Sequence, residues 1–420
     1  MLSKKLGLDQ ISKQLKNSKV LMRVDYNVPV VQGHIQDSTR IMSSIPSLQK
    51  ILSENPKSLV LMSHLGRPNG KASTKNSLLP VANELEYLLG TNVTFLQDCV
   101  GEEVRQRVAD ARNGEVIVLE NLRFHAEEEG KYKDANGNKV KVDKQKIQAF
   151  RDELTSLGEI FVNDAFGTAH RAHSSMVGIN HKVRAAGYLL QKELENFSVA
   201  LENPRKPYLV ILGGAKVQDK IQLIDNLLDK VNEMIIGGGM AFTFLKKIHN
   251  LDIGNSLFDK EGYELVDKLL AKAKRNNVKL HFPVDFLCAD KVDASAATSL
   301  HDLSTGIPSG LLGLDAGPKT TLENIEAVKR ANLIVWNGPQ GVFELDAFKK
   351  GSTELLDAVV ARTAAGATSI IGGGDTVNLV QKQNMGQKVT HVSTGGGASL
   401  ELLEGKSLPG IEHLSNANEI

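Results

Sequence analysis

Short apolar runs alternate along the chain with stretches whose apolar residues recur at helical spacing. The runs are almost unbroken by polar residues, which is typical of parallel strands buried on both faces of a sheet. They read KVLMRVDYNV, SLVLMSH, EVIVLENL, EIFVNDAF, YLVILGG, EMIIGGG, NLIVWNGP and SIIGGG. The pattern therefore predicts parallel β-sheet in both halves of the chain.

The intervening stretches predict amphipathic helices. One apolar stripe runs along residues 41–52 and another along residues 217–228, with apolar side chains three or four positions apart. The stripes consist of Ile41, Ile45, Leu48 and Leu52, and of Val217, Ile221, Ile224 and Leu228. Strands that alternate with helices predict an α/β protein with two doubly wound, Rossmann-like parallel-sheet domains.

The two halves differ in the residues that follow their strands. Up to about residue 180 the strands end in His, Arg, Asn and Asp, as in RVDYN, SHLGR, LENLRFH and NDAFGTAHRAH. Beyond Pro204 they end mostly in glycine, as in ILGGAK, IIGGGM, NGPQG, IGGGDT and STGGGAS. Ligands of open α/β sheets bind outside the carboxyl ends of the strands. The first half therefore suits an anionic small molecule, and the second suits a polyphosphate.

We predict two domains joined by a hinge, with an active-site cleft between them. The N-terminal domain is expected to comprise residues 1–186, with residues 405–420 packing back on it, and the C-terminal domain residues 187–404. The expected connectors are LLQKELENFSVAL and the STGGGAS turn, where glycines absorb backbone rotation at little steric cost. The polar segment at residues 127–143 contains an Asn-Gly turn signal and is expected to form a surface hairpin or loop.

The composition argues against several classes of protein. The 420 residues include 50 basic and 49 acidic ones, whereas general nucleic-acid or membrane-surface binders usually carry an overall basic excess. Any anion site must therefore be a local cluster. The hydrophobic content of 41% is enough to fill two domain cores.

Cysteine usage and the absence of targeting signals indicate the compartment. Cys99 and Cys288 are the only cysteines, which argues against a disulfide framework and favours a reducing environment. The charged N-terminal residues lack the apolar run of a signal peptide. The most apolar stretch, residues 234–244, is shorter than the roughly 20 residues that cross a bilayer. These features predict a soluble cytoplasmic protein.

GGAKVQDK at residues 213–220 follows a predicted strand and opens a predicted helix. At such a place backbone N–H groups and the helix dipole favour a phosphate. Lys216 and Lys220 are four residues apart and are expected on one face of the helix, where two ammonium groups neutralise a transferring phosphoryl group. The alternative is a glycine turn followed by two solvated lysines.

IGGGDT at residues 371–376 also runs from a strand into a helix and places a carboxylate at the phosphate end. Magnesium is typically held by one or two carboxylates together with phosphate oxygens, so Asp375 is a candidate ligand, directly or through water. An ordinary helix N-cap at Asp375 is the alternative.

Arginines and histidines recur at successive strand ends of the first half. Guanidinium presents a bidentate fork to phosphate and carboxylate, so such a cluster is a good receptor for both groups. Taken singly, each arginine is more often a surface charge. The candidates are Asp25, Asn27, Arg40, His64, Arg67, Arg123, His170 and Arg171.

With these strings in order, the chain resembles the phosphoglycerate kinase family from end to end. The resemblance is carried by RVDYNVP, SHLGRP, LENLRFHAEEEG, FVNDAFGTAHRAHSS, ILGGAKVQDKI, IIGGGMAFTF, WNGPQGVFE, IGGGDT and HVSTGGGASLELLEGK. It implies reversible phosphoryl transfer from 1,3-bisphosphoglycerate to MgADP, giving 3-phosphoglycerate and ATP in glycolysis and gluconeogenesis. It implies Mg²⁺ as cofactor and small molecules as partners, with neither nucleic acid nor membrane, and the expected state is a monomer.

The resemblance also assigns roles to residues. Lys216 and Arg40 bracket the transferring phosphoryl group, Glu344 lies toward the ribose hydroxyls, and Asp375 lies toward magnesium. The implied phosphoglycerate ligands are Asp25, Asn27, Arg40, His64, Arg67, Arg123 and Arg171, with His170 nearby. The implied nucleotide ligands are Gly214, Lys220, Gly238, Gly313, Asn337, Glu344, Gly373, Gly374, Asp375 and Thr376.

Two places depart from the family pattern near the expected nucleotide site. Leu311 and Leu312 stand where members commonly show tryptophan and methionine, and Gln340 occupies a position that is usually small and apolar. These departures bear on base preference and nucleotide affinity rather than on the reaction.

Two other functions compete with this interpretation. A dinucleotide-dependent oxidoreductase would share the α/β architecture, but no G-x-G-x-x-G occurs, since Phe242 and Val377 interrupt the two nearest matches. A non-catalytic nucleotide-binding protein of the same fold would be expected to have lost Lys216, Arg40 or Asp375, and the chain retains all three.

Overall fold

The computed structural model describes residues 1–419, which divide into two compact units. Unit 1 comprises Met1–Glu195 together with the described residues from Ser407 onward, and unit 2 comprises Asn196–Lys406. The division falls within helix α8 (Tyr188–Leu201), later in the chain than the boundary expected after residue 186. Ile420, the last residue of the segment expected to pack on the first domain, lies outside the described residues.

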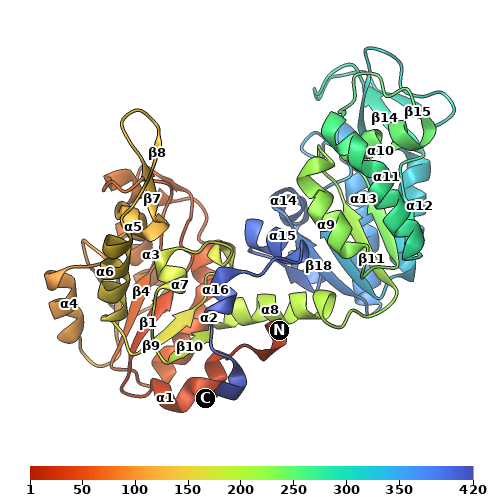
Figure 1. Cartoon of the computed structure of the whole chain (residues 1–420). Helices are drawn as coiled ribbons and strands as arrows, with labels where there is room; N and C mark the ends of the chain where they lie inside the picture. Colours follow the sequence, from red (N-terminus) through yellow and green to blue (C-terminus); the bar gives the residue numbers. More distant parts are fainter. Residues whose placement is uncertain (420) are drawn as a thin grey trace. The chain divides into compact units, whose positions relative to one another are not determined.

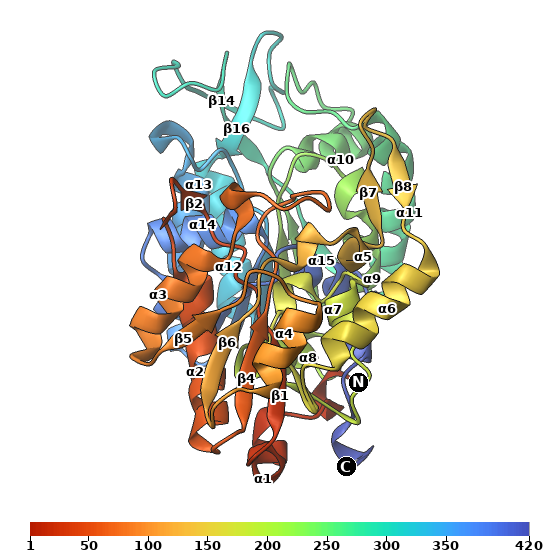
Figure 2. The ribbon, with the colours of Figure 1, turned by 90° about the vertical axis from the view of Figure 1, so that its left-hand side faces the viewer.

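Unit 1 is built on a six-stranded sheet in which neighbouring strands are parallel. The strand order is β10-β9-β1-β4-β6-β5. In Figure 2, β5, β6, β4 and β1 follow one another across the face of this unit. The strands are β1 (Lys19–Arg23), β4 (Ser58–Met62), β5 (Val93–Phe95), β6 (Glu115–Val118), β9 (Ile160–Asn163) and β10 (Val183–Ala186). The apolar runs of the first half thus form buried parallel strands, as predicted.

Side chains of these strands alternate between two hydrophobic cores. Val20 and Leu59 pack with residues of α2 and α3, whereas Leu21 and Val60 pack with residues of α4 and α6. Because successive side chains of a strand point to opposite faces, helices must cover both faces of the sheet. The helices are α1 (Ser12–Leu15), α2 (Thr39–Ser53), α3 (Leu79–Leu89), α4 (Glu102–Ala109), α5 (Ala126–Glu129), α6 (Lys144–Thr155), α7 (Ser174–Val177) and α16 (Pro409–Glu412).

The C-terminal segment returns to unit 1. The Leu6 N–H donates to the Ser415 carbonyl, and the Ser415 N–H donates to the Arg184 carbonyl, both at 2.9 Å. The Gly410 N–H donates to the Ala169 carbonyl, also at 2.9 Å. These backbone hydrogen bonds tie the end of the chain to β10 and to the loop that follows β9.

The polar segment at residues 127–143 contains the expected surface hairpin. Strands β7 (Lys131–Lys133) and β8 (Lys139–Lys141) pair antiparallel and project from unit 1 in Figure 1. Gly137 has a φ of +81°, a left-handed conformation that glycine adopts without strain. Of the hairpin or loop expected for this segment, the structure has the hairpin. A second short hairpin pairs β2 (Val30–Val31) with β3 (His34–Ile35).

Unit 2 repeats the architecture with a second six-stranded parallel sheet, in the order β13-β12-β11-β17-β18-β19. Its strands are β11 (Tyr208–Leu212), β12 (Glu233–Ile236), β13 (Lys279–His281), β17 (Leu333–Asn337), β18 (Thr368–Gly372) and β19 (His391–Val392). A smaller antiparallel sheet joins β15 (Ser299–Asp302), β14 (Asp285–Ala289) and β16 (Leu312–Ala316) in that order. This small sheet was not predicted from the pattern of apolar runs.

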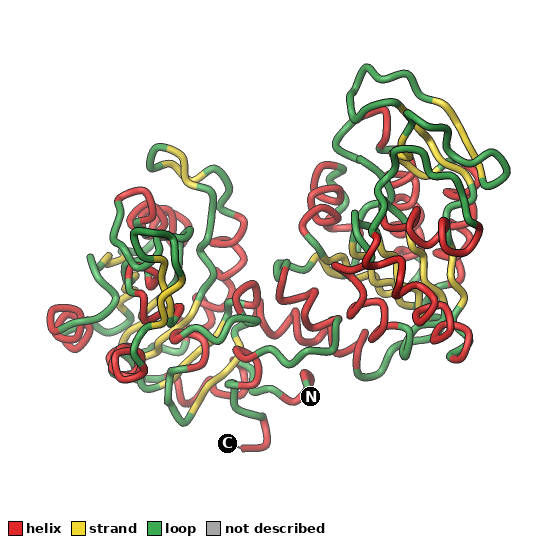
Figure 3. The backbone as a smooth tube through the Cα atoms, turned by 45° about the horizontal axis from the view of Figure 1, so that its top comes forward, coloured by secondary structure: helices red, strands yellow, loops and turns green. Residues whose placement is uncertain are grey.

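The core of unit 2 also lies between sheet and helices. Ile211, Trp336 and Ile371 of three neighbouring strands pack with residues of α12, α13 and α14. Figure 3 shows the strands of each unit as yellow segments among red helices. The helices of unit 2 are α9 (Ile221–Leu227), α10 (Met240–His249), α11 (Lys260–Arg275), α12 (Pro318–Arg330), α13 (Lys350–Ala364), α14 (Gly374–Lys382) and α15 (Gly397–Leu403). Within residues 1–419, no helix has both the length and the apolar character that crossing a membrane requires.

The strand orders place particular loops at the switch point of each sheet. In unit 1, β1 lies between β9 and β4, and in unit 2, β11 lies between β12 and β17. Later strands are therefore added on both sides of β1 and of β11, so the strand order reverses at these central strands. Ligands of such sheets bind outside the carboxyl ends of the strands at this point. Asp25 and Asn27 follow β1, and Gly213 and Gly214 follow β11.

Candidate functional site

Two predicted residues follow β1 and organise the loops around it. The Nη1 atom of Arg40, in the first turn of α2, lies 2.7 Å from Oδ2 of Asp25. The Arg40 side chain is 41% exposed and that of Asp25 only 12%, so the guanidinium keeps an open side for an anion. Oδ1 of Asn27 accepts a hydrogen bond from the Gly66 N–H at 2.9 Å. This bond links the loop after β1 to the loop after β4.

Arg123 reaches the same loop from the segment after β6. Its Nη1 donates to the Gly66 carbonyl at 2.8 Å, and its Nε lies 3.7 Å from Oε1 of Glu129. Burial lowers the pKa of Arg123, although the carboxylate of Glu129 opposes this shift. Guanidinium groups stay protonated in proteins, so Arg123 is a fixed cation at this edge of the sheet.

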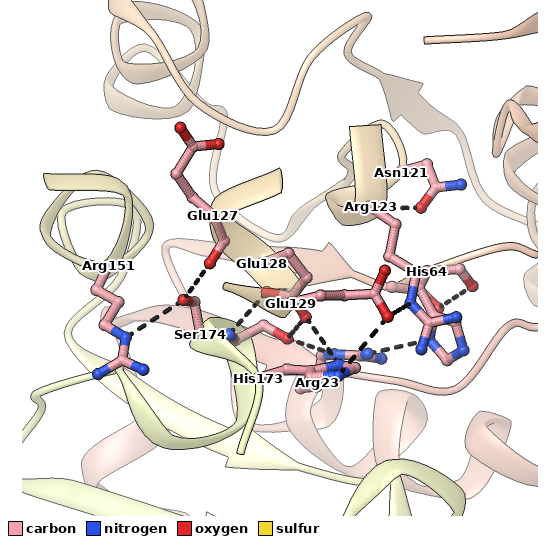
Figure 4. Close-up of polar contacts among 12 residues, drawn as sticks. Arg23, His64, Asn121, Arg123, Glu127, Glu128, Glu129, Arg151, His173 and Ser174 are labelled. Atoms are coloured by element: carbon pink, nitrogen blue, oxygen red, sulfur yellow. Dashed lines mark hydrogen bonds and ion pairs between the residues drawn. The ribbon is translucent and has the colours of Figure 1, made fainter. Parts of the chain in front are cut away.

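Beneath these residues lies a buried arginine that the sequence analysis did not single out. Arg23, the last residue of β1, is 0% exposed, and its Nε donates to Oγ of Ser175 at 2.8 Å. The N–H and Oγ of Ser175 donate to the two carboxylate oxygens of Glu128, at 2.9 and 2.6 Å. A buried charge is costly unless it is paired and hydrogen-bonded. The connected network places Arg23 and Glu128, both labelled in Figure 4, so that each stabilises the other.

His64 and His173 lie in the same network, as Figure 4 shows. Nη2 of Arg23 lies 3.0 Å from Nδ1 of His64. Burial, followed by the charges of Arg23 and Arg123, holds the pKa of His64 well below its ordinary value of 6.5. Burial and the same two arginines lower the pKa of His173 to about 3. Both rings are therefore neutral at pH 7, and Nδ1 of His64 accepts from Arg23 while Nε2 carries the proton.

We expect His64 and His173 to make the folded state less stable as the pH falls below about 6.5. The unfolded chain binds protons at His64 and His173 near pH 6.5, whereas the folded chain binds them only at much lower pH, so acid favours unfolding. The urea midpoint, followed by circular dichroism, should fall between pH 6.5 and 5. His173→Gln removes one of the two groups and should make the decline shallower. An identical decline in the variant would contradict this assignment.

The other candidates of the first half lie in loops around this network. Arg67 is exposed in the loop after β4, Arg171 is exposed in the loop after β9, and His170 beside it is half-buried. The positive charge of Arg67 contributes to the lowered pKa of Arg123, and that of Arg171 to the lowered pKa of His173. The structure therefore gathers the predicted cluster at the carboxyl ends of four strands of unit 1.

Glycine turns form the backbone of the second receptor, in unit 2. Gly214, after β11, has a φ of +139°, and Gly238, after β12, has a φ of +66°. A Cβ on Gly238 would stand 2.7 Å from the Gly214 nitrogen, and one on Gly213 would stand 1.9 Å from the Pro339 carbonyl oxygen. Any side chain at these positions would collide with a neighbouring loop. Only glycine lets the turns after β11, β12 and β17 pack backbone against backbone.

The prediction that Lys216 and Lys220 share one helical face is wrong. Residues Gln218–Lys220 form a 3₁₀ turn, and α9 begins only at Ile221. The Gln218 N–H donates to Oδ2 of Asp259 at 2.8 Å, so it does not form the hydrogen bond that would extend α9 toward Lys216. Lys216 therefore lies in the loop before this turn, where it is exposed.

Lys220 turns toward the end of β17. Its Nζ donates to the Asn337 carbonyl at 2.9 Å and also to the Asn337 side-chain oxygen. Burial lowers the pKa of Lys220 to about 8, while the carboxylates of Asp375 and Asp219 oppose the shift. Nδ2 of Asn337 is buried without a hydrogen-bond partner among residues 1–419. The ammonium group and this unpaired donor give the site the polarity that an anion requires.

Asp375 lies in the first turn of α14, after the glycine turn that ends β18. The N-cap of this helix is Gly373, with a φ of +83°, so the alternative of an N-cap at Asp375 is wrong. Asp375 and the preceding Gly374 are exposed. Thr376 is buried, and its Oγ1 accepts a hydrogen bond from the Gly338 N–H at 2.7 Å. Thr376 thus holds α14 against the loop after β17 and leaves Asp375 accessible.

A cavity of about 290 Å³ lies at these turns in unit 2. A Cβ on Gly313, in β16, would stand 2.2 Å from the ring of Phe242, so glycine keeps this wall flat. The wall also includes Leu257 and Val292, which are 56% and 57% exposed. The predicted residues that line the cavity are Gly214, Gly238, Gly313 and Asp375. An apolar wall beside glycine turns and a carboxylate is suited to a nucleotide.

Glu344 lies between β17 and the 3₁₀ turn Asp346–Phe348 and is exposed.

Asp315 is a residue that the sequence analysis missed: it is 5% exposed and lines the cavity. Its carboxylate accepts the N–H groups of Gly351 and Ala316 at 2.8 and 2.9 Å. Burial raises the pKa of Asp315 to about 7. The only available signal was a single carboxylate within an apolar run.

A second possible metal site, separate from Asp375, lies in unit 1. The ligand atoms of Asp98, Cys99 and His125 lie within 4.8 Å of one another. Oδ1 of Asp98 already accepts hydrogen bonds from Nε2 of His125 and from the Cys99 N–H, each at 2.6 Å. Burial and the charge of Asp98 raise the pKa of the Cys99 thiol well above its ordinary value, which disfavours the thiolate. We therefore assign no metal to this group.

Comparisons with known proteins agree with one another. The family model described as phosphoglycerate kinase matches residues 8–406. The phosphoglycerate kinase of Tetrahymena thermophila is 67% identical over 420 residues, which cover 100% of both chains. Phosphoglycerate kinase 1 of Homo sapiens is 58% identical over 416 residues, or 99% of both chains. The solved structure of phosphoglycerate kinase from Coxiella burnetii has a TM-score of 0.86 at 37% identity, covering 97% of this chain and 98% of that one.

Proposed function

Because the chain belongs to the phosphoglycerate kinase family, we propose that unit 1 holds the three-carbon substrate and unit 2 holds the nucleotide. The chain is a kinase, a phosphotransferase whose acceptor is a carboxyl group. It transfers a phosphoryl group reversibly from the acyl phosphate of 1,3-bisphosphoglycerate to ADP, giving 3-phosphoglycerate and ATP. One observation carries the assignment of ligands: arginines gather at the strand ends of unit 1, and a glycine-walled cavity with Lys220 nearby lies in unit 2.

In unit 1 the arginines bind and orient the substrate. Arg40, Arg67, Arg123 and Arg171 provide guanidinium forks for the phosphate and the carboxylate of 3-phosphoglycerate. Neutral His64 donates from Nε2, because Arg23 occupies its Nδ1. The buried network beneath them fixes Arg123 and His64 in place, so that little ordering entropy is lost when the substrate binds.

The reaction needs no catalytic base. The group of 3-phosphoglycerate that attacks ATP is a carboxylate, which is ionised at neutral pH because carboxyl pKa values lie near ~4. Catalysis therefore consists of charge neutralisation and alignment of the reacting atoms, which must approach to about 3–3.5 Å. Arg40, which is partly exposed, and Lys216, which is exposed, are proposed to neutralise the transferring phosphoryl group.

Mg²⁺ is the proposed companion of the nucleotide. The exposed carboxylate of Asp375 stands at the start of α14 and lines the nucleotide cavity, which fits a cation held by one carboxylate and phosphate oxygens. When bound, Mg²⁺ neutralises charge on the phosphates. Gly373 and Gly374 bring the helix start close to the phosphates, and the Lys220 ammonium adds a second positive charge.

A coupled assay for ATP-dependent consumption of 3-phosphoglycerate tests the activity. Turnover that depends on Mg²⁺ is expected. Nucleotide binding without any turnover would instead support the alternative of a non-catalytic nucleotide-binding protein of the same fold.

We expect Arg67→Ala and Arg171→Ala each to weaken 3-phosphoglycerate binding by about tenfold or more, because a hydrogen bond to a charged group contributes ~1.5–3 kcal/mol. Binding of ADP should change little, since the proposed nucleotide residues belong to unit 2. Titration calorimetry measures both. Arg112→Ala is the control, because this exposed arginine precedes β6 and so lies at the amino ends of the strands, away from the proposed substrate residues. Equal losses for both ligands would refute the assignment of ligands to units.

We further propose that the chain acts as a monomer in the cytoplasm and binds neither nucleic acid nor membranes. Cys99 and Cys288 are both buried and unpaired, which is compatible with a reducing compartment. The near balance of basic and acidic residues supports small anions as the ligands. Sedimentation at several concentrations would reveal a dimer if one forms.

A further inference from the structure

The cavity of unit 2 contains a buried carboxamide that the fold leaves incompletely paired. Gln340, in the loop after β17, lines the cavity and is 4% exposed. Its backbone N–H donates to Oγ of Ser352 at 2.9 Å. Its side-chain Nε2 is buried and has no hydrogen-bond partner in the described part of the chain. A buried polar group without a partner destabilises the folded state, so a ligand that accepts a hydrogen bond from Nε2 would remove this cost.

Gln340 is held against the turn that follows β12. A Cβ on Gly237 would stand 1.9 Å from Oε1 of Gln340, so the carboxamide lies directly over this glycine. The next two residues of the turn, Gly238 and Gly239, line the cavity. The hydrogen-bonded backbone of Gln340 and the glycine beneath its side chain thus hold the carboxamide at the cavity wall. Rotation about the terminal side-chain torsion exchanges the positions of its oxygen and its nitrogen.

The other polar side chains of the wall are already engaged or stand near the phosphates. The carboxylate of Asp315 accepts two backbone N–H groups, and Oδ1 of Asn255 accepts one. Asp375 lies in the first turn of α14 and is the proposed magnesium ligand. The wall is otherwise largely apolar, with Phe242, Leu257, Val292, Leu312 and Val342 among its residues. Among the described residues that line the cavity, Gln340 is therefore the one whose side chain offers a buried, unpaired donor to a flat base.

We infer that Gln340 is a specificity-determining residue of this kinase, which reads the polar edge of the adenine base. A carboxamide presents one acceptor and one donor side by side, and adenine presents the amino group at C6 beside a ring nitrogen acceptor. The pair forms two hydrogen bonds at once. A purine without the amino group can form only one. This inference rests on the proposed function, since it concerns the nucleotide that the cavity holds.

Nucleotide selectivity tests the inference with the full-length enzyme. Calorimetric Kd values are measured for ADP, for purine riboside 5′-diphosphate, which lacks the 6-amino group, and for 2′-deoxyADP. Wild type should bind ADP about fivefold more tightly than purine riboside diphosphate. Gln340→Met replaces the carboxamide with an unbranched side chain of similar length. The variant should bind ADP at least about fivefold more weakly than wild type and should lose the preference for ADP over purine riboside diphosphate. It should leave the thermal midpoint of the free enzyme unlowered, because no hydrogen bond of the free side chain is lost.

Val292→Ala is the matched control, because it removes apolar wall without removing a hydrogen-bonding group and should weaken both purine nucleotides alike. Equal binding of the two nucleotides by wild type would overturn the inference without any variant. The inference would also be overturned if Gln340→Met still preferred ADP to purine riboside diphosphate. A variant that changed only the preference between ADP and 2′-deoxyADP would overturn it too, because that preference concerns the ribose and not the base. Failure of wild type to consume 3-phosphoglycerate with ATP would instead reject the proposed function, so the two failures are distinguishable.

Discussion

Lys216→Ala should lower turnover by about two to three orders of magnitude while changing ADP binding little. Removing one donor that stabilises developing charge typically costs ~2.7–4 kcal/mol in the transition state. Lys216 is exposed in the loop between β11 and α9, so truncation should not disturb the core. Lys220, by contrast, is held at the end of β17 by its hydrogen bonds to Asn337. The exposed lysine is therefore the one available to contact a transferring phosphoryl group.

Steady-state turnover and calorimetric binding of ADP are measured on the same preparation. Lys268→Ala is the control, because it removes an exposed lysine in the middle of α11 and should leave both quantities near wild type. Turnover of Lys216→Ala within about threefold of wild type corresponds to well under ~1 kcal/mol and would exclude the proposed role. A loss confined to ADP affinity would place Lys216 in binding rather than in phosphoryl transfer.

The parallel sheets could be predicted because their strands are buried on both faces. Such strands are apolar at nearly every position, and a short, unbroken apolar run such as YLVIL is typical of them. The glycine turns were predictable for a related reason: close packing of backbones leaves no room for a side chain at Gly213 or Gly238. These features depend on local sequence and on sterics alone.

The start of α9 could not be predicted in the same way. Helical spacing of Lys216 and Lys220 indicated a helix, but a hydrogen bond from Gln218 to Asp259, distant in sequence, decides where the helix begins. The buried network in unit 1 was missed for the same reason. Arg23 interrupts an apolar strand, yet only the fold brings Glu128 and Ser175 to it.

This buried network provides the second large effect. Arg23→Met should lower the free energy of unfolding by about 3–5 kcal/mol, because removal of one charge leaves the carboxylate of Glu128 buried without its counter-charge. The variant also removes the hydrogen bonds that Arg23 donates to Nδ1 of His64 and to Oγ of Ser175. Urea unfolding at pH 7.5, followed by circular dichroism, measures the change.

The double variant Arg23→Met with Glu128→Gln separates charge from packing. It removes both charges, so it should be more stable than the sum of the two single changes predicts, with a coupling free energy above ~1 kcal/mol. Arg112→Met is the control for an exposed arginine and should cost less than about 1 kcal/mol. Strict additivity of Arg23→Met and Glu128→Gln would show that the two charges do not interact. The loss in Arg23→Met would then come from the cavity that the arginine leaves, and the network would not be what fixes Arg123 and His64 for the substrate.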